Sequence, residues 1–245
     1  NNATSRQNLI DSLVTVVSNR NGGGVNIDFE GISDSALKAN VTLFLSNLTT
    51  RFHRDIPGSE VSVALPAVDW NNVFDMAALD SFLDYAIIMG YDYSWKGGPT
   101  AGPVAPLQAS STFGSLSVSN SINTYLGKGI RPSKLLLGCP YYGYDWPTVD
   151  YSLPGATRGT GSAVLYPNAK ANATSHGRQW SDAGSVPFYF YTNSGARQCF
   201  YDDAQSLGLK YDLINSKGIG GVGIWALGYD DPNPELWALL AQKFA

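Results

Sequence analysis

Cysteine, histidine and methionine are scarce in this chain of 245 residues, which has two of each. The histidines and cysteines stand singly, so no metal-ligand spacing is present and we expect neither a metal ion nor a cofactor. Cys139 and Cys199 can form one disulfide or can remain two buried thiols that pack as small hydrophobic side chains. Two cysteines give no spacing framework that decides between these alternatives.

Charge is also sparse: charged residues make up 15% of the chain and the net charge is -4. No basic stripe is visible, so we expect no nucleic-acid partner. No apolar run reaches the length of a membrane span, so we expect no membrane partner. Low charge with many Asn, Ser, Thr, Gly and Tyr residues favours a secreted or cell-surface protein that binds neutral ligands. The absence of an initiator Met and of a signal peptide at Asn1 indicates a processed or excised chain.

Five apolar runs have strand character, in a chain that is 44% hydrophobic. Most are nearly continuous, as expected of parallel strands that are buried on both faces. They are residues 24–29, 60–68, 85–93, 134–142 and 221–229. Helical patterns lie around and between them at residues 5–20, 33–52, 75–85, 117–129, 202–218 and 233–245. This alternation predicts βα units and a parallel sheet, which is an α/β fold class.

Two stretches interrupt the alternation. Residues 94–116 are rich in Gly, Pro, Ser and Thr, and we expect them to form a long loop. Residues 144–201 contain no clear helical pattern, and we expect two or three antiparallel strands there. The sequence therefore predicts one domain over residues 1–245 that contains a small β-rich insertion at 144–201.

The segment GVNIDFEG, residues 24–31, has an unusual polar pattern. Side chains alternate between the two faces of a strand, so its apolar residues share one face. The other face carries Asn26, Asp28 and Glu30. A packed sheet does not carry an amide and two carboxylates in a row without a use for them. A structural ion pair is the alternative, but no Arg or Lys lies nearby in the sequence.

The later strands also end in residues whose side chains can bind a ligand or take part in a reaction. These are Met89, Tyr91, Asp92 and Tyr93, then Tyr141, Tyr142 and Trp146, and finally Trp225. In parallel α/β folds the ligand site lies at the carboxyl ends of the strands. Aromatic rings stack on the apolar faces of pyranose rings, and carboxyl groups act on the glycosidic oxygen. The sequence thus predicts a sugar site. Further aromatic residues can either line it or pack in the core: Trp95, Trp146, Trp180, Tyr189 and Tyr191.

Four motifs resemble those of family 18 glycoside hydrolases, the chitinase family, and in particular its bacterial type. GGVNIDFEG resembles the DGxDxDxE signature, MGYDY the M-x-Y-D motif, GCPYYG the G-x-P-x-Y-G motif and GVGIWALGYDD the final strand. They occur in family order across nearly all of the chain. The resemblance implies a (β/α)8 TIM barrel. It also implies endo-acting, retaining hydrolysis of β-1,4-linked N-acetylglucosamine polymers such as chitin, assisted by the substrate's acetamido group.

The resemblance also implies residue roles. Glu30 matches the general acid, Asp28 the residue that orients the acetamido group, and Tyr91 a hydroxyl that hydrogen-bonds the acetamido oxygen. The substrate-binding positions are Asn26, Met89, Asp92, Tyr142 and Trp225. Two alternatives remain open: a non-catalytic barrel that binds chitin or another glycan, and a β-N-acetylglucosaminidase that cleaves peptidoglycan or N-glycans.

Two departures from the family pattern have consequences. Asn26 and Gly23 stand where most members have Asp. An amide at position 26 can hydrogen-bond Asp28 but cannot take its proton, so we expect an altered pH profile with activity retained.

The second departure is length. The strand at 24–29 matches the fourth of eight, so only strands four to eight have counterparts here. Three alternatives follow. The chain is a fragment of a longer protein, a missing N-terminal segment or a second copy of the chain completes the barrel, or the incomplete barrel caps its own edge strands.

Overall fold

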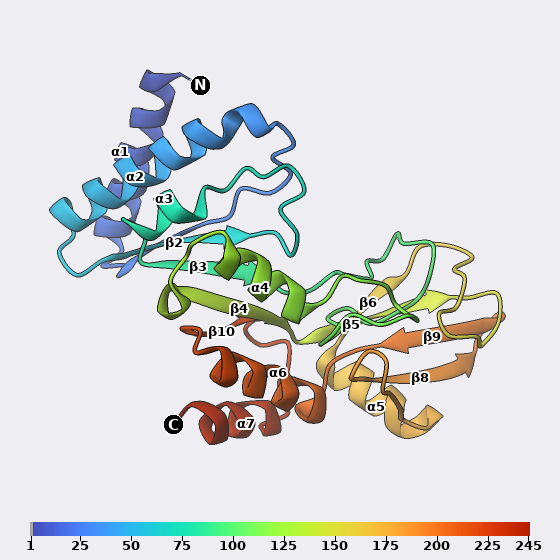
Figure 1. Ribbon diagram of the computed structural model, residues 1–245. Helices are drawn as coiled ribbons and strands as arrows, with labels where there is room; N and C mark the ends of the chain where they lie inside the picture. Colours follow the sequence, from blue (N-terminus) through green and yellow to red (C-terminus); the bar gives the residue numbers. More distant parts are fainter. Residues whose placement is uncertain (1) are drawn as a thin grey trace. The chain divides into compact units, whose positions relative to one another are not determined.

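The computed structural model describes residues 2–245, which form two compact units. The first unit comprises the residues up to 89 together with 123–136 and 219–221. The second comprises residues 90–122, 137–218 and 222–245. Figure 1 labels the elements of both units, and each unit is described by itself below.

The first unit is built on parallel strands. β1 (Gly24–Ile27) pairs with β2 (Glu60–Leu65), and β2 pairs with β3 (Tyr85–Met89). Alternate residues of β2 are almost fully buried, because Val61, Val63 and Leu65 are each at most 2% exposed. The strands that follow along the chain are β4 (Leu135–Pro140) and β10 (Gly221–Trp225), both of which begin in this unit. The parallel strands predicted from the strand–helix alternation are therefore confirmed.

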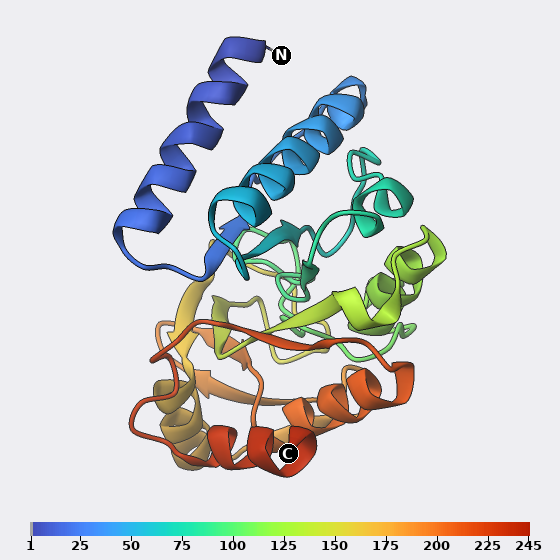
Figure 2. The same ribbon diagram turned by 90° about the vertical axis from the view of Figure 1, so that its left-hand side faces the viewer.

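Helices cover the parallel strands of the first unit. α1 (Ala3–Asn19) and α2 (Lys38–Asp55) lie side by side, and α2 packs against β2 (Figure 2). A short 3-10 turn, η1 (Ser35–Leu37), precedes α2, and Asp34 caps it by accepting from Ala36 N. The shorter elements are α3 (Met76–Asp80) and η2 (Pro132–Lys134), and the second half of α4 (Val118–Gly127), from residue 123 on, also belongs to this unit.

The parallel sheet has the strand order β1-β2-β3-β4-β10, so β1 and β10 stand at its two ends. Over residues 2–245 the strands do not close into a barrel. Each strand is also shorter than its apolar run. β2 ends at Leu65 because Pro66 has no N–H to donate to the ladder. β3 ends at Met89, and three residues later Asp92 has the positive φ of 60° that breaks an extended run.

The second unit contains an antiparallel sheet with the order β6-β5-β9-β8-β7. Its strands are β5 (Tyr142–Pro147), β6 (Ser162–Leu165), β7 (Gln179–Ser181), β8 (Val186–Thr192) and β9 (Ala196–Phe200). The sequence predicted two or three strands here, and the structure has five. Strands β6 and β7 are only three or four residues long, too short to produce a clear alternating pattern.

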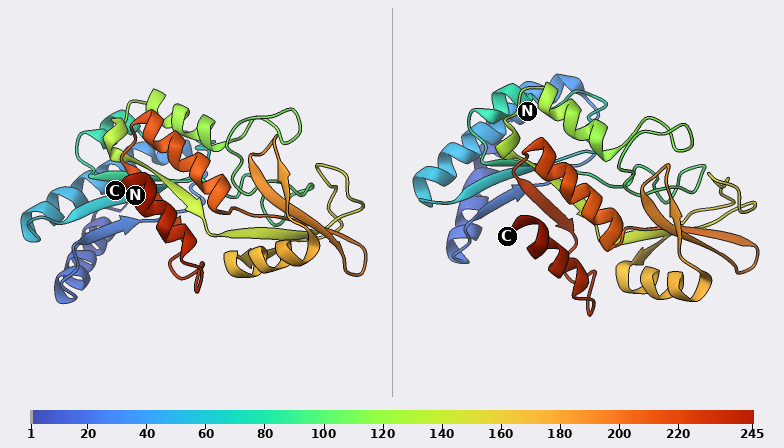
Figure 3. Two further views of the ribbon diagram at one scale, coloured as in Figure 1. Left: turned by 90° about the horizontal axis from the view of Figure 1, so that it is seen from below. Right: turned by 60° about the horizontal axis from the view of Figure 1, so that its bottom comes forward.

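A helix, α5 (Tyr166–His176), lies within residues 144–201 where none was expected, and it packs against β8 (Figure 3). The expectation was wrong because the buried face of α5 is made mostly of small residues: Tyr166, Ala169 and Ala173. Alanine favours a helix but gives little apolar contrast in the sequence. α6 (Ala204–Lys217) and α7 (Glu235–Phe244) complete this unit and pack against each other (Figure 3).

Aromatic rings form the core beside this antiparallel sheet. Trp146 is fully buried among Tyr144, Phe188 and Phe200. Tyr189 is also fully buried, so core packing rather than sugar contact describes Trp146 and Tyr189. Trp95 is 54% exposed, and Trp180 and Tyr191 are partly exposed. Both cysteines are buried free thiols, which confirms the packing alternative for them.

Candidate active site

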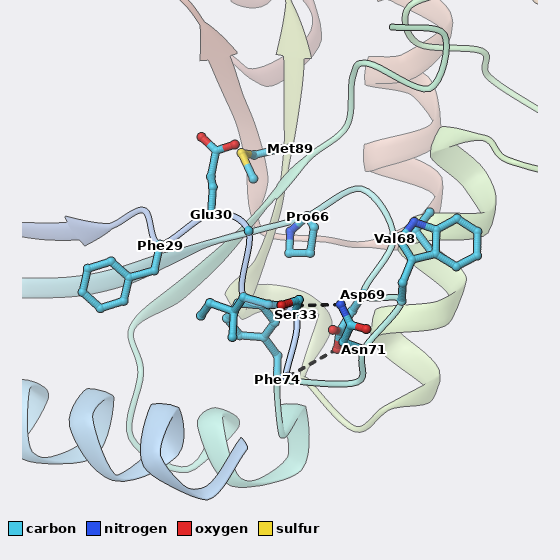
Figure 4. Close-up of a pocket in the computed structure, with 12 residues that line it drawn as sticks. Phe29, Glu30, Ser33, Pro66, Val68, Asp69, Asn71, Phe74 and Met89 are labelled. Carbon is cyan, nitrogen blue, oxygen red and sulfur yellow. Dashed lines mark hydrogen bonds between the residues drawn. The ribbon is translucent and has the colours of Figure 1, made fainter. Parts of the chain in front are cut away.

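A pocket of about 230 Å³ opens where the parallel strands of the first unit end. It is lined by residues 29–33, which follow β1, by residues between 66 and 74, which follow β2, and by Met89, the last residue of β3. Figure 4 shows these side chains. The carboxyl ends of three neighbouring strands thus build the pocket, at the edge of a parallel sheet where ligand sites occur.

Glu30 enters this pocket because side chains continue to alternate between the two sides of the chain beyond the last residue of β1. Ile27 is buried, and the Phe29 ring stacks on Phe44 of α2 with centroids 5.6 Å apart. Glu30 then points away from Phe29, to the same side as Met89 (Figure 4). Gly31 has a φ of 71°, a left-handed conformation that glycine adopts readily, and it turns the chain immediately after the carboxylate.

Asn26 and Asp28 come before Glu30 in the chain, and both are exposed. The strand ends at Ile27, one residue earlier than Asp28, so the predicted strand over 24–29 is too long. Asn26 pairs in register with Ser62 of β2, and its amide donates to the Ser62 hydroxyl at 2.9 Å. The sequence suggested a hydrogen bond from Asn26 to Asp28, whereas the contact that the structure shows is this one across the two strands.

Asp92 is the centre of a polar cluster in the second unit. Its two carboxylate oxygens accept hydrogen bonds from the Tyr142 hydroxyl at 2.5 Å and the Tyr144 hydroxyl at 3.0 Å. The Tyr91 ring meets the Tyr142 ring edge-on, with centroids 6.1 Å apart. The structure therefore brings together three predicted site residues and adds Tyr144. The sequence contains a signal for Tyr144, since it lies two residues after Tyr142 on the same face of β5.

The two phenols that face Asp92 are held in their neutral form. Burial, followed by the nearby Asp92 carboxylate, raises the pKa of Tyr144 to about 12. Burial and the hydrogen bond to Asp92 raise the pKa of Tyr142 well above its usual range. Both hydroxyls therefore remain hydrogen-bond donors to Asp92 throughout the neutral pH range.

Trp225 is the last residue of β10 in the second unit, and half of it is exposed. Its backbone carbonyl accepts a hydrogen bond from Tyr141 N at 2.8 Å. Of the predicted site residues, four belong to the first unit and four to the second. The first four are Asn26, Asp28, Glu30 and Met89, and the second four are Tyr91, Asp92, Tyr142 and Trp225.

The loop after β2 was missed by sequence reasoning. Asp69 and Trp70 lie in it and both line the pocket that contains Glu30. Asp69 has only 3% of its side chain exposed and is paired with Lys128, whereas Trp70 is 75% exposed. The signal was available, because VDWNN places an aromatic residue among polar ones directly after a buried strand.

Neither a metal centre nor a membrane-spanning helix emerges from residues 2–245. No group of three or more His, Cys, Asp and Glu side chains in that range can hold a metal ion. No helix in the same range is long and apolar enough to cross a membrane.

The model of the family "Glycosyl hydrolases family 18" matches residues 1–230 of the chain. The chain therefore belongs to glycosyl hydrolases family 18, a family of glycoside hydrolases. This agrees with the order of the four sequence motifs and with the pocket at the ends of the parallel strands.

The curated relatives are moderately similar and longer. The chain is 29% identical to the putative sporulation-specific glycosylase YdhD of Bacillus subtilis, covering 93% of this chain and 52% of that protein. It is 25% identical to the cortical fragment-lytic enzyme of Bacillus subtilis, covering 100% of this chain and 55% of that protein. It is 27% identical to the di-N-acetylchitobiase of Rattus norvegicus, covering 99% and 73%. The chain thus spans about half the length of the first two relatives.

Two solved structures share the fold. The Group IV chitinase of Ostrinia furnacalis, in complex with allosamidin, has a TM-score of 0.88 at 21% identity, covering 98% of this chain and 73% of that one. The C-terminal domain of a putative chitinase from Desulfitobacterium hafniense has a TM-score of 0.86 at 28% identity, covering 100% and 74%. The fold of this chain is therefore the α/β fold of that family.

Proposed function

We propose that this chain is the larger part of the catalytic domain of an endo-acting hydrolase that cleaves β-1,4-linked N-acetylglucosamine polymers such as chitin. The observation that carries this proposal is Glu30, an intact carboxyl side chain in a pocket at the ends of three parallel strands. Membership of glycosyl hydrolases family 18 supports it. Residues 144–201 are proposed as an insertion within that domain.

The proposed chemistry assigns the proton to Glu30. Its carboxyl group protonates the glycosidic oxygen while the acetamido oxygen of the substrate attacks the anomeric carbon, and the bond to the leaving sugar breaks. Water then attacks the anomeric carbon of the cyclic intermediate while the Glu30 carboxylate takes its proton, the bond to the acetamido oxygen breaks, and this second displacement retains the configuration. Asp28 orients the acetamido group and stabilises its developing positive charge. The exposed position of Glu30 allows both proton transfers at a site that substrate and water can reach.

The remaining site residues are proposed to hold the same sugar. Tyr91 hydrogen-bonds the acetamido oxygen, Met89 and Asp92 line the sugar, and Trp225 stacks beneath it. Tyr142 fixes the Asp92 carboxylate through the 2.5 Å hydrogen bond. Asn26 is proposed to change the pH profile, because a neutral amide replaces a carboxylate two residues from Asp28.

A second candidate substrate is the glycan strand of peptidoglycan. Several curated relatives have the names sporulation-specific glycosylase or cortical fragment-lytic enzyme rather than chitinase. The same carboxylates would act on either glycan, because the reacting unit is an N-acetylated sugar in both.

A substrate panel tests this proposal. The protein is incubated with N-acetylglucosamine oligomers, peptidoglycan strands and a high-mannose N-glycan, and products are identified by mass. Release of N,N'-diacetylchitobiose from the oligomers supports the chitinase proposal, and cleavage of peptidoglycan alone supports the second candidate. Binding without cleavage of any glycan, measured with the complete barrel, would replace both with a non-catalytic glycan-binding role.

Two further proposals concern the whole protein. We propose that an additional segment, or a second copy of the chain, supplies the strands that complete an eight-stranded barrel. β1 and β10 at the two ends of the sheet order support this, as does coverage of 73% of the Ostrinia furnacalis chain. We also propose a secreted or cell-surface location, which cell fractionation would test.

A further inference from the structure

Trp70 is the feature of the first unit that the proposed chemistry leaves unused. The side chain is 75% exposed, more than the half-exposed Trp95, Trp225 and Trp237. Single exposed apolar residues are common on protein surfaces, so exposure alone indicates nothing. The residues around Trp70, however, hold its loop in a fixed conformation, which a surface residue without a function would not require.

The first sign of organisation is a buried carboxylate next to the indole. Asp69 accepts hydrogen bonds from Val73 N at 2.9 Å and Phe74 N at 3.3 Å, which close a turn within the loop. Asp69 also pairs with Lys128 Nζ at 3.0 Å. Asn72, with a φ of 50°, lies inside this turn. The residue that follows Asp69 in the chain, Trp70, is therefore held on the outside of a fixed turn.

The second sign is that the loop is tied at two other places. The Tyr125 hydroxyl donates to the carbonyl of Pro66 at 2.7 Å, at the point where the loop leaves β2. The Asn71 amide donates to the carbonyl of Ile32 at 3.4 Å (Figure 4). Ile32 belongs to the segment that follows Glu30. The loop that carries Trp70 and the segment that carries Glu30 are thus linked directly to each other.

The third observation is the shared pocket. Trp70 and Glu30 both line the 230 Å³ cavity, from loops that leave adjacent parallel strands. An indole presents a flat apolar face, and a pyranose ring presents a face of C–H groups that packs well on such a surface. A ring fixed in advance loses little conformational entropy when it binds a ligand.

We infer that Trp70 is a saccharide-stacking residue that packs against an N-acetylglucosamine unit of the bound glycan beyond the two units that flank the linkage at Glu30. This inference rests on the proposed function and specifies it further. Trp70 contributes to recognition of oligomers long enough to reach it and makes no contact with shorter ones. Trp70 therefore makes the protein prefer longer oligomers.

The test compares two tryptophans of the protein in its active form. Trp70→Ala and Trp70→Phe are the test variants, and Trp237→Ala is the matched control, since Trp237 is 49% exposed on α7 and does not line the pocket. kcat/KM is measured for N-acetylglucosamine oligomers of increasing length. We expect Trp70→Ala to lower kcat/KM for long oligomers about three- to tenfold and to leave the shortest cleaved oligomer unchanged. Trp70→Phe should retain most of the wild-type value, and Trp237→Ala all of it.

A binding measurement separates this inference from the proposed function. In a Glu30→Gln background, stacking on Trp70 should shift tryptophan fluorescence to shorter wavelength, and the shift should be smaller in Glu30→Gln/Trp70→Phe, where the contribution of Trp70 is removed and that of Trp225 remains. If the wild type cleaves no polymer but shows this Trp70-dependent shift, the catalytic proposal fails and the stacking inference stands. If cleavage is normal and Trp70→Ala behaves like Trp237→Ala at every length, the inference is overturned. Absence of both cleavage and the shift overturns both.

Discussion

Lys128 Nζ lies 3.0 Å from Oδ2 of Asp69, and this pair holds the first residue of the turn that contains the exposed Trp70. Asp69 has 3% of its side chain exposed and Lys128 has 27%, so the acceptor is buried and the donor is partly solvated. A buried carboxylate that loses one of its donors keeps its desolvation cost without the compensating interaction. The pair therefore links the stability of the first unit to the geometry of its pocket.

This relationship predicts a large effect of Lys128→Met. We expect a loss of about 1–3 kcal/mol in the free energy of unfolding, because the Asp69 carboxylate retains only its two backbone donors. Lys170→Met is the control. Lys170 pairs with Glu235 at a more exposed site, where 46% and 32% of the two side chains are accessible. An exposed pair contributes about 0–1 kcal/mol. Urea unfolding measures both, and equal losses in the two variants would contradict this account of Asp69.

Glu30→Gln tests the catalytic assignment. The amide preserves the shape of the side chain but has no acidic proton to give, so we expect turnover to fall by at least about 10²–10⁴-fold. Oligomer affinity should stay close to that of the wild type, as measured by calorimetry. Glu60→Gln is the matched control, because Glu60 is an exposed carboxylate at the start of β2, outside the pocket. Near wild-type rates for Glu30→Gln would show that another group supplies the proton.

The buried and partly buried phenols of the second unit predict how stability depends on alkaline pH. Burial is the largest cause that raises the pKa of Tyr141, Tyr144 and Tyr191, each to about 12, from an ordinary value near 10. A raised pKa in the folded state means that the folded protein holds the proton more tightly than the unfolded chain. The stability that this provides is complete below about pH 10 and is lost as the pH rises through about 12.

We therefore expect the melting temperature to fall steeply between about pH 10 and pH 12, together with the appearance of tyrosinate absorbance. Tyr144→Phe should make this fall shallower, because one of the protons that the folded state retains is then absent. Tyr151→Phe is a suitable control, since Tyr151 is 45% exposed. A melting temperature that stays constant over this range would mean that these phenols titrate freely in the folded protein.

The sequence predicted the parts of this protein that depend on local pattern. The parallel strands follow from continuous apolar runs, and the position of Glu30 follows from the alternation that puts Phe29 against α2. The missed parts depend on long-range contacts. Lys128 and Asp69 are 59 residues apart in the sequence, and no local pattern predicts that they pair. α5 was missed because its buried alanines give little apolar contrast in the sequence. The shortened β1 reflects tertiary hydrogen bonding, which ends one residue before Asp28.

The two ends of the parallel sheet yield the last prediction, which concerns the chain expressed by itself. β1 and β10 end the strand order, and the β10 sequence GVGIW has no Pro or charged residue to discourage pairing with another chain. We expect residues 1–245 alone to associate or to be poorly soluble, and to show weak activity. Ile224→Lys in β10 should raise the monomer fraction in sedimentation, because a charged residue in an edge strand disfavours edge pairing.

Leu209→Lys on α6, which is 38% exposed, is the control for added charge and should leave the monomer fraction unchanged. An N-terminal segment of the kind proposed above to complete the barrel, added in trans, should increase both solubility and the rate of oligomer cleavage. A monodisperse monomer of residues 1–245 that melts cooperatively and is fully active would contradict the prediction. It would mean that the side chains flanking β1 and β10 protect these strands without further residues, and that the eight-stranded barrel is not needed for catalysis.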